Sequence, residues 1–284
     1  MDVATRPTFR ALLITRPTDP APSWGLVPAI LVSGAAILLF GVHLRPLGYV
    51  PLVLGVALGF VLDRSLGRSL FLVALGQAII STISLEADLS DAGMVRFAVV
   101  LSLAVAVPFA ISRWVFHDDV IRFPFRTREP WSRVAWTYLI AVVGLGYLIL
   151  PWYFITSGAY ANWPAVETGG EIARLFVGVN AVGIWDELFF VCTVFALYRR
   201  HFPLWQANLL QAAVFVSFLW ELGYRSWGPL LTIPFALVQG LTFALTKSLT
   251  YVLCVHLLFD LVVFGVIVHA HNPELFDIFL VSTR

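Results

Sequence analysis

The sequence predicts an all-α fold, a bundle of transmembrane helices in a polytopic integral membrane protein. Of its 284 residues, 60% are hydrophobic and only 12% are charged, whereas soluble domains carry about 25% charged residues. The mean hydropathy is +0.88, and 23 Phe and 10 Trp suit contact with lipid and its interfaces. The lipid bilayer is therefore the first partner that the composition predicts.

A transmembrane helix needs about 20 mostly apolar residues. Charged or Pro- and Gly-rich connections divide this chain into a series of such runs. They cover residues 24–43, 47–62, 67–85, 94–116, 134–156, 172–198, 204–222, 229–246 and 248–269. The second run is short and the last two meet at Lys247, so the sequence predicts eight or nine spans.

The basic residues alternate between the connections. If the amino terminus is cytoplasmic, the inner connections hold Arg6, Arg10, Arg16, Arg64, Arg68, Arg113, Arg122, Arg126, Arg128, Arg133, Arg199, Arg200 and Lys247. The outer connections hold the acids Glu86, Asp88, Asp91 and Glu167, with Arg45, Arg96 and Arg225 as exceptions. This positive-inside pattern predicts a cytoplasmic amino terminus and, with nine spans, an outer carboxyl terminus. The small size and the lack of organelle signals favour a bacterial inner (plasma) membrane.

The connections also suggest how the chain is organised. Residues 1–23, rich in Pro and Arg, are expected to form a disordered cytoplasmic tail. The basic connection 113–133 ends a first unit of four helices, residues 24–133, and a second unit follows at 134–270, with a tail at 271–284. Cys192 and Cys254 lie in apolar runs and predict neither a disulfide nor a thiolate metal site. The net charge of +1, without a basic stripe, excludes a nucleic-acid partner.

Polar residues inside the predicted spans are the candidate site. Asp186 and Glu187 are adjacent in an apolar run, where each charge costs roughly 2.5 to 3.5 kcal/mol at the bilayer centre. His256 and Asp260 are four residues apart and share one helix face. At about 1.5 Å per residue from the inner arginines and lysine, Glu187, His256 and Asp260 lie at comparable depths. These residues can therefore meet, although His256 and Asp260 could also be only a structural hydrogen-bonded pair.

Glu221 lies nearer the outer end of its helix. Arg225 follows four residues later, which favours an interfacial ion pair between the two. If Glu221 instead reaches the other acids, the carboxyl groups cannot all be ionised in a low dielectric. Several then hold protons, or a divalent metal such as Mn, Zn or Mg binds among Asp186, Glu187, Glu221, His256 and Asp260. No other cofactor is indicated.

These residues resemble a known family. Asp186 and Glu187, followed by the run 246–260 that ends in His256 and Asp260, resemble the CPBP family of intramembrane endopeptidases, the CAAX-protease and bacteriocin-processing group also called Abi. The family pattern is EExxxR, then FxxxH, then HxxxN or HxxxD on three helices, and the resemblance covers residues 172–264. The chain departs from it at two places. Val191 stands at the arginine, and Glu221 or Trp220 stands at the middle histidine, with Ser217 or Val216 at the phenylalanine.

The resemblance implies an intramembrane peptidase, a hydrolase that acts on a membrane-associated peptide or protein. Glu187 would activate a water molecule and His256, oriented by Asp260, would polarise the peptide bond, with Asp186 beside them. Two other classes remain open. One is a non-catalytic relative that binds or protects a membrane partner, since the arginine and the middle histidine are absent. The other is a proton- or ion-coupled transporter, although we find no paired halves with broken helices.

Overall fold

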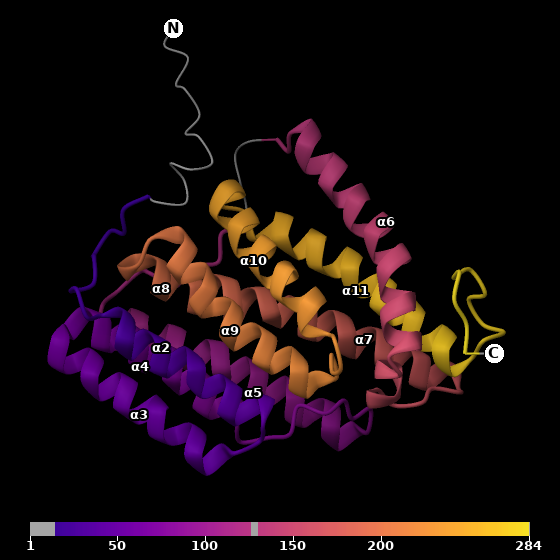
Figure 1. Cartoon of the computed structure of the whole chain (residues 1–284), viewed down its shortest axis with the longest axis horizontal. Helices are drawn as coiled ribbons and strands as arrows, with labels where there is room; N and C mark the ends of the chain where they lie inside the picture. Colours follow the sequence, from indigo (N-terminus) through magenta and orange to yellow (C-terminus); the bar gives the residue numbers. More distant parts are fainter. Residues whose placement is uncertain (1–14, 126–129, 284) are drawn as a thin grey trace, which may run out of the picture.

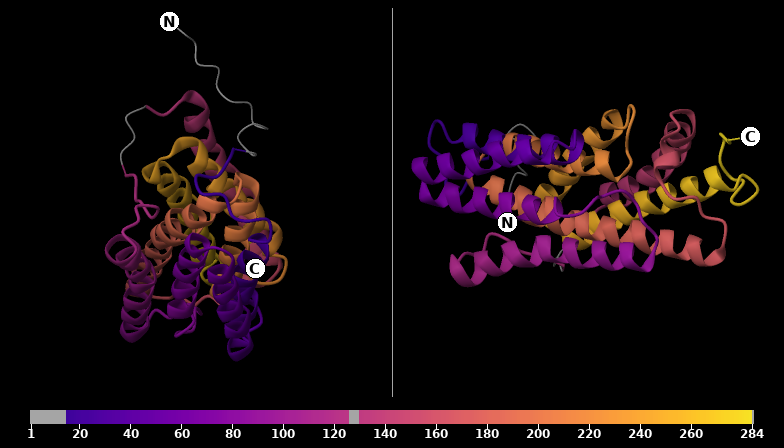
Figure 2. Two further views of the ribbon diagram at one scale, coloured as in Figure 1. Left: turned by 90° about the vertical axis from the view of Figure 1, so that its left-hand side faces the viewer. Right: turned by 90° about the horizontal axis from the view of Figure 1, so that it is seen from below.

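The computed structural model describes residues 15–125 and 130–283. Within these ranges the secondary structure is helical, which confirms the all-α class, and most helices run along one direction with their connections at two ends (Figure 2). The helices are α2 (Leu26–Ala36) with η1 (Ile37–Gly41), α3 (Arg45–Leu62), α4 (Arg64–Ile80), α5 (Asp91–Ala110) with η2 (Ile111–Val115), α6 (Arg133–Thr156), the short η3 (Ala159–Asn162), α7 (Gly169–Asp186) with η4 (Glu187–Phe195) and α8 (Ala196–His201), α9 (Leu204–Leu222), α10 (Pro229–Thr246) and α11 (Leu249–His271).

Several of these helices are long and apolar enough to cross a membrane. Six helical stretches of the described chain satisfy both conditions: Arg45–Leu62, Asp91–Val115, Arg133–Thr156, Gly169–His201, Pro229–Thr246 and Leu249–His271. The helix Leu26–Gly41 is apolar but shorter. The protein is thus a polytopic helical membrane protein, and the number of crossings stays a prediction.

Local capping explains where helices begin and end. The Asp63 carboxylate accepts a hydrogen bond from the Leu66 backbone N–H, so α4 begins at Arg64, earlier than the predicted run at 67. A capping box of Thr168 and Glu171 starts α7. Lys247 adopts a positive φ of 50° and Ser248 caps the next helix, so the two runs that meet there are separate helices.

The helix ends gather on two faces of the bundle. We call the end that carries Arg64, Arg113, Arg133 and Arg199 the arginine-rich face, and the end that carries residues 81–91 and 157–168 the acidic face. The described chain starts beside α8 on the first face and finishes at the second (Figure 1). The sorting of charge that the sequence predicts is therefore reproduced in space, while the orientation in the membrane stays a prediction.

The segment before α2 is tied to the arginine-rich face. The backbone N–H of Asp19 donates to the Arg200 carbonyl at 3.0 Å, and the Asp19 carboxylate accepts hydrogen bonds from Ser65 and Arg200. The hydrogen bond from Ser65 is the main cause that lowers the pKa of Asp19, helped by the nearby positive charges. Residues 1–14 of the predicted tail lie outside the described residues.

Two helical rods occupy the middle of the bundle. The α7–η4–α8 rod and α9 lie between the group α2 to α5 and the group α6, α10 and α11 (Figure 1). The best membrane window of the Gly169–His201 rod is accordingly 56% buried, against 22% for α3 and for α5 with η2, and the window of the adjacent α11 is 50% buried. This central position brings the polar residues of α7, η4 and α11 into the interior.

The predicted ion pair between Glu221 and Arg225 is wrong. Glu221 is 1% exposed and accepts from Arg45 at 3.2 Å and from the backbone N–H of Leu85 at 3.1 Å. Arg225 pairs instead with Glu86 at 3.2 Å. Arg96, the third arginine that the sequence leaves as an exception on the acidic face, pairs with Asp88 at 3.1 Å, so all three have acidic partners. Gly223, with a φ of 135°, turns the chain after α9 and separates Glu221 from Arg225.

We predict that Arg45→Met lowers stability by roughly 2 kcal/mol, because Glu221 then keeps a buried charge with only the Leu85 N–H. Partial exposure of Arg45 limits the loss. Thermal unfolding of the purified protein in detergent measures the change. The double variant with Glu221→Gln should recover part of it, and Arg96→Met, at an exposed pair, should change stability by less than about 0.5 kcal/mol. Equal losses for Arg45→Met and Arg96→Met would contradict the prediction.

Candidate functional site

Four of the five predicted site residues meet around one imidazole. His256 Nδ1 lies 2.7 Å from Glu187 Oε1, while His256 Nε2 lies 3.6 Å from Asp186 Oδ2 and 3.8 Å from Asp260 Oδ1. The neighbours Asp186 and Glu187 point about 100° apart on their helix, so they reach opposite nitrogens of the same ring. We call these four residues the acid–imidazole cluster. Glu221 faces α3 and residues 81–85 and is not part of it.

Glu187 is held by a residue that the sequence reasoning missed. The Gln239 amide of α10 donates to Glu187 Oε1 at 2.6 Å, so this oxygen has two partners, Gln239 and His256. Glu187 Oε2 is buried and has no hydrogen-bond partner among the described residues. A lone buried amide in the apolar run 229–246 is the signal that could have pointed to Gln239, since buried polar groups need partners.

A glycine allows α11 to approach α7. A Cβ placed on Gly183 would lie 1.9 Å from Asp260 Oδ2 and 3.2 Å from His256 Cδ2. Real Cβ atoms do not come that close, so any larger residue at this position would push the Asp260 carboxyl away. Gly183 therefore sets the position of the helix that carries both His256 and Asp260.

Aromatic rings of α9 and α10 flank the imidazole. The Phe235 ring of α10 meets His256 edge-on at 5.0 Å between centroids, and the Phe215 ring of α9 lies at 6.2 Å. Helix α9 thus presents Phe215 to the cluster, and neither Glu221 nor Trp220 stands there as a second polar partner. Val191, at the family's arginine position, is fully buried in the π-helix η4.

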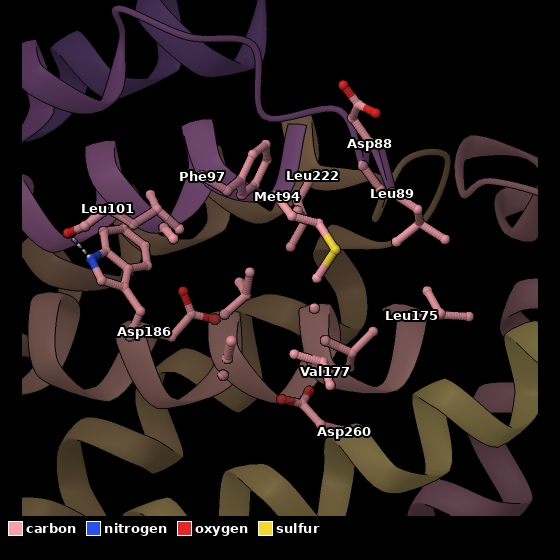
Figure 3. A pocket seen from close by; sticks show the side chains of 18 of the residues that line it. Asp88, Leu89, Met94, Phe97, Leu101, Leu175, Val177, Asp186, Leu222 and Asp260 are labelled. Atoms are coloured by element: carbon pink, nitrogen blue, oxygen red, sulfur yellow. Dashed lines mark hydrogen bonds between the residues drawn. The ribbon is translucent and has the colours of Figure 1, made fainter. Parts of the chain in front are cut away.

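A cavity of about 320 Å³ lies against the cluster. Its walls are formed mainly by apolar side chains of α5 and α7, and Asp186 and Asp260 project toward it from one side (Figure 3). Asp186, His256 and Asp260 line the cavity, but Glu187 does not. Asp186 Oδ1 and Asp260 Oδ2 are buried and have no hydrogen-bond partner in the described chain. These two oxygens are therefore the acceptors with unused capacity next to the cavity.

The charge of the cluster limits its chemistry. Three carboxyl groups surround one imidazole, and no ion pair in the described part of the chain links them to an arginine or lysine. A protonated imidazole can balance only one carboxylate, so not all three can be ionised in a low dielectric. The cluster can thus both accept and supply protons.

The arrangement does not assemble the five-residue metal set considered from the sequence. Glu221 is held elsewhere by Arg45. Within residues 15–125 and 130–283, no group of three or more His, Cys, Asp or Glu side chains is placed to hold a metal ion. The geometry supports proton transfer by side chains at the end of a cavity.

The protein is a helical membrane bundle in which buried acids and a histidine lie beside a cavity. Residues 168–262, about a third of the chain, match the family model of the type II CAAX prenyl endopeptidase Rce1-like proteins. This match supports the resemblance of the segment to the CPBP family. The matched segment starts at the cap of α7 and ends within α11, and so includes the whole cluster. No curated protein and no solved structure matches the chain.

Proposed function

We propose that this protein is an intramembrane peptidase of the CAAX-protease type, which hydrolyses a peptide bond with a water molecule activated in the acid–imidazole cluster. The observation that carries the proposal is the Asp186 carboxyl group. It lies at the inner end of the cavity, 3.6 Å from His256 Nε2, with one oxygen that has no partner among the described residues.

The proposed reaction needs a base, an orienting group and an acid. Asp186 takes a proton from water as the water oxygen adds to the carbonyl carbon of the peptide bond. The C–N bond then breaks, and the amine leaves with a proton from the cluster. His256, between Asp186 and Asp260, stabilises the charge that develops on these groups. The water is consumed and both products are released, so no other reactant is required.

This assignment moves the base from Glu187 to Asp186. The sequence favours Glu187, but that side chain is 0% exposed, does not line the cavity and bonds to His256 Nδ1. A carboxyl group in this place orients the ring and determines which nitrogen carries the proton. We therefore propose that Glu187 positions His256, while Asp260 shares the proton at Nε2.

The experiment that tests the proposal compares peptide termini in membranes. Cells that produce the wild type should contain new internal termini in membrane proteins, and cells that produce Asp186→Asn at the same level should not. The same termini in both would contradict the proposal. A segment identified in this way then serves as the substrate in reconstituted vesicles.

A second candidate function is binding or protection of a membrane partner without catalysis. Val191 and Phe215 favour it, because they supply neither the cation nor the second imidazole of the family pattern. If no new termini form and the cellular function survives Asp186→Asn, this candidate replaces the peptidase.

Gln239 should act on the rate through Glu187. We predict that Gln239→Leu lowers kcat about tenfold with KM unchanged, because Glu187 loses one of the two hydrogen bonds that hold it. The matched control is Gln211→Leu, since Gln211 is also a buried amide at the α9–α10 contact and, among the described residues, bonds to Asn208 and the Ala236 carbonyl and not to the cluster. It should lose similar thermal stability and keep kcat. A similar kcat for the two variants would assign Gln239 a structural role alone.

A further inference from the structure

The cavity beside the cluster is built at one end of the bundle. Its lining comes from residues 87–89, the first half of α5, Trp163, residues 175–186 of α7, the end of α9 with Tyr224, and His256 and Asp260 of α11. Each of these segments lies at the acidic face or belongs to a helix that has one end there. Asp88, on the connection before α5, lines the cavity and has a side chain 38% exposed. In Figure 3 Asp88 lies at the side of the cavity away from Asp186 and Asp260.

The route from the other end is packed. Trp185 donates from its indole Nε1 to the Leu101 carbonyl at 2.6 Å, and its ring stacks on Phe189 at 5.1 Å. Phe190 stacks on Phe215 at 4.3 Å. Cys192 forms a further buried cluster with Leu249 and Val252. Described side chains therefore fill the space between the acid–imidazole cluster and the arginine-rich face.

The lining also restricts the charge of an occupant. Its inner end presents carboxyl groups, and no lysine or arginine is among the described residues that line it. A carboxylate placed there would lose its hydration and meet like charges. Most of the remaining wall is apolar and includes Met94, Phe97, Leu175 and Leu222, while Asp88 and Ser102 are polar. Uncharged, apolar side chains suit such a wall.

We propose that the substrate segment is an uncharged, apolar internal stretch of peptide that reaches Asp186 from the acidic face, and not a free carboxyl terminus that arrives from the arginine-rich face. This inference rests on the proposed function, because a peptide substrate presupposes a peptidase. The direction of access does not depend on the proposed function, because it states only to which side of the membrane the cavity opens.

Labelling of single cysteines with a charged, membrane-impermeant thiol reagent tests the direction of access. Cys192 and Cys254 are first replaced by Ala, and Val179→Cys, on the cavity wall, is the probe. Glu86→Cys and Asp119→Cys report the acidic and the arginine-rich faces, since both side chains are more than half exposed. Each variant is labelled in right-side-out and in inverted membrane vesicles.

Val179→Cys should react at least tenfold faster in the vesicle type in which Glu86→Cys reacts. Faster reaction in the type that labels Asp119→Cys, or none in either, would overturn the inferred access. Adding Asp186→Asn should not change the labelling. If the wild type hydrolyses no peptide but shows this labelling pattern, the peptidase proposal fails and the access proposal stands.

The charge of the occupant is tested by protection of Val179→Cys. A Leu–Ala hexapeptide with an acetylated amino end and an amidated carboxyl end should slow the labelling severalfold. The same peptide with a free carboxylate should protect much less. Equal protection by both peptides, or none by the capped peptide, would overturn the preference for an uncharged segment.

Discussion

Replacing Asp186 by Asn will lower kcat for peptide hydrolysis by about 10²- to 10⁴-fold, the usual contribution of a general base. The amide has the same shape as the carboxyl group, so the packing between α7 and α11 is kept. It cannot take a proton from water, and that step is lost. The measurement is the initial rate in vesicles with the segment identified from membrane termini, together with thermal unfolding to show that the fold is intact.

Glu187→Gln is the matched control on the neighbouring residue. The carbonyl oxygen of the introduced amide can still accept from His256 Nδ1 and Gln239, so the ring keeps its orientation. We expect a loss of about tenfold in kcat, typical of a residue that orients a catalytic side chain through a hydrogen bond and does not contact the substrate. A larger loss for Glu187→Gln than for Asp186→Asn would return the role of base to Glu187, as the sequence suggests.

Replacing Gly183 by Ala will displace Asp260 and His256 and lower kcat about 10²-fold, the scale expected for a misplacement of about 1 Å. The added Cβ would lie 1.9 Å from Asp260 Oδ2, so the Asp260 carboxyl group must shift or α7 and α11 must move apart. We expect a loss of about 1–3 kcal/mol in stability from overpacking. It should appear although Ala is the better helix former by about 1 kcal/mol.

Two variants check the cause of this loss. Gly144→Ala, in α6, adds the same methyl group where nothing lies within 4 Å, and should keep both stability and kcat. Gly183→Ala with Asp260→Ala removes the carboxyl group that the methyl meets and should regain stability without regaining the full rate. If Gly183→Ala alone is as stable and active as the wild type, the close approach of α7 and α11 does not determine the site.

The helices themselves could be predicted from the sequence because apolar run length and connection chemistry are local properties. The run predicted at 134–156 is α6 (Arg133–Thr156), and the run at 229–246 matches α10 (Pro229–Thr246). Boundaries shifted where a side-chain cap decides them, as at Asp63 before α4. The π-helix η4, which begins at Glu187, left no trace in the apolar pattern.

The site was predictable in its members but not in its contacts. Depth along each helix indicated that Glu187, His256 and Asp260 could meet, and they do. Depth gives no information about which way a side chain points around its helix axis relative to other helices. That is why Glu221 was paired with the nearby Arg225, whereas the fold supplies Arg45 from a helix 176 residues away in the chain.

The sequence by itself determined that this is a helical membrane protein, where its charges lie along each helix, and which buried acids and histidine are candidates for function. Hydropathy, charge sorting and four-residue spacing are enough for that, because each depends on neighbours in the chain. Only the tertiary structure decided that Asp186 lines the cavity while Glu187 bonds to His256 away from it. It also decided that Gln239 and Gly183 hold the cluster in place and that Phe215 of α9 contacts it. Those assignments depend on how α7, α9, α10 and α11 are rotated against one another, which packing in three dimensions sets.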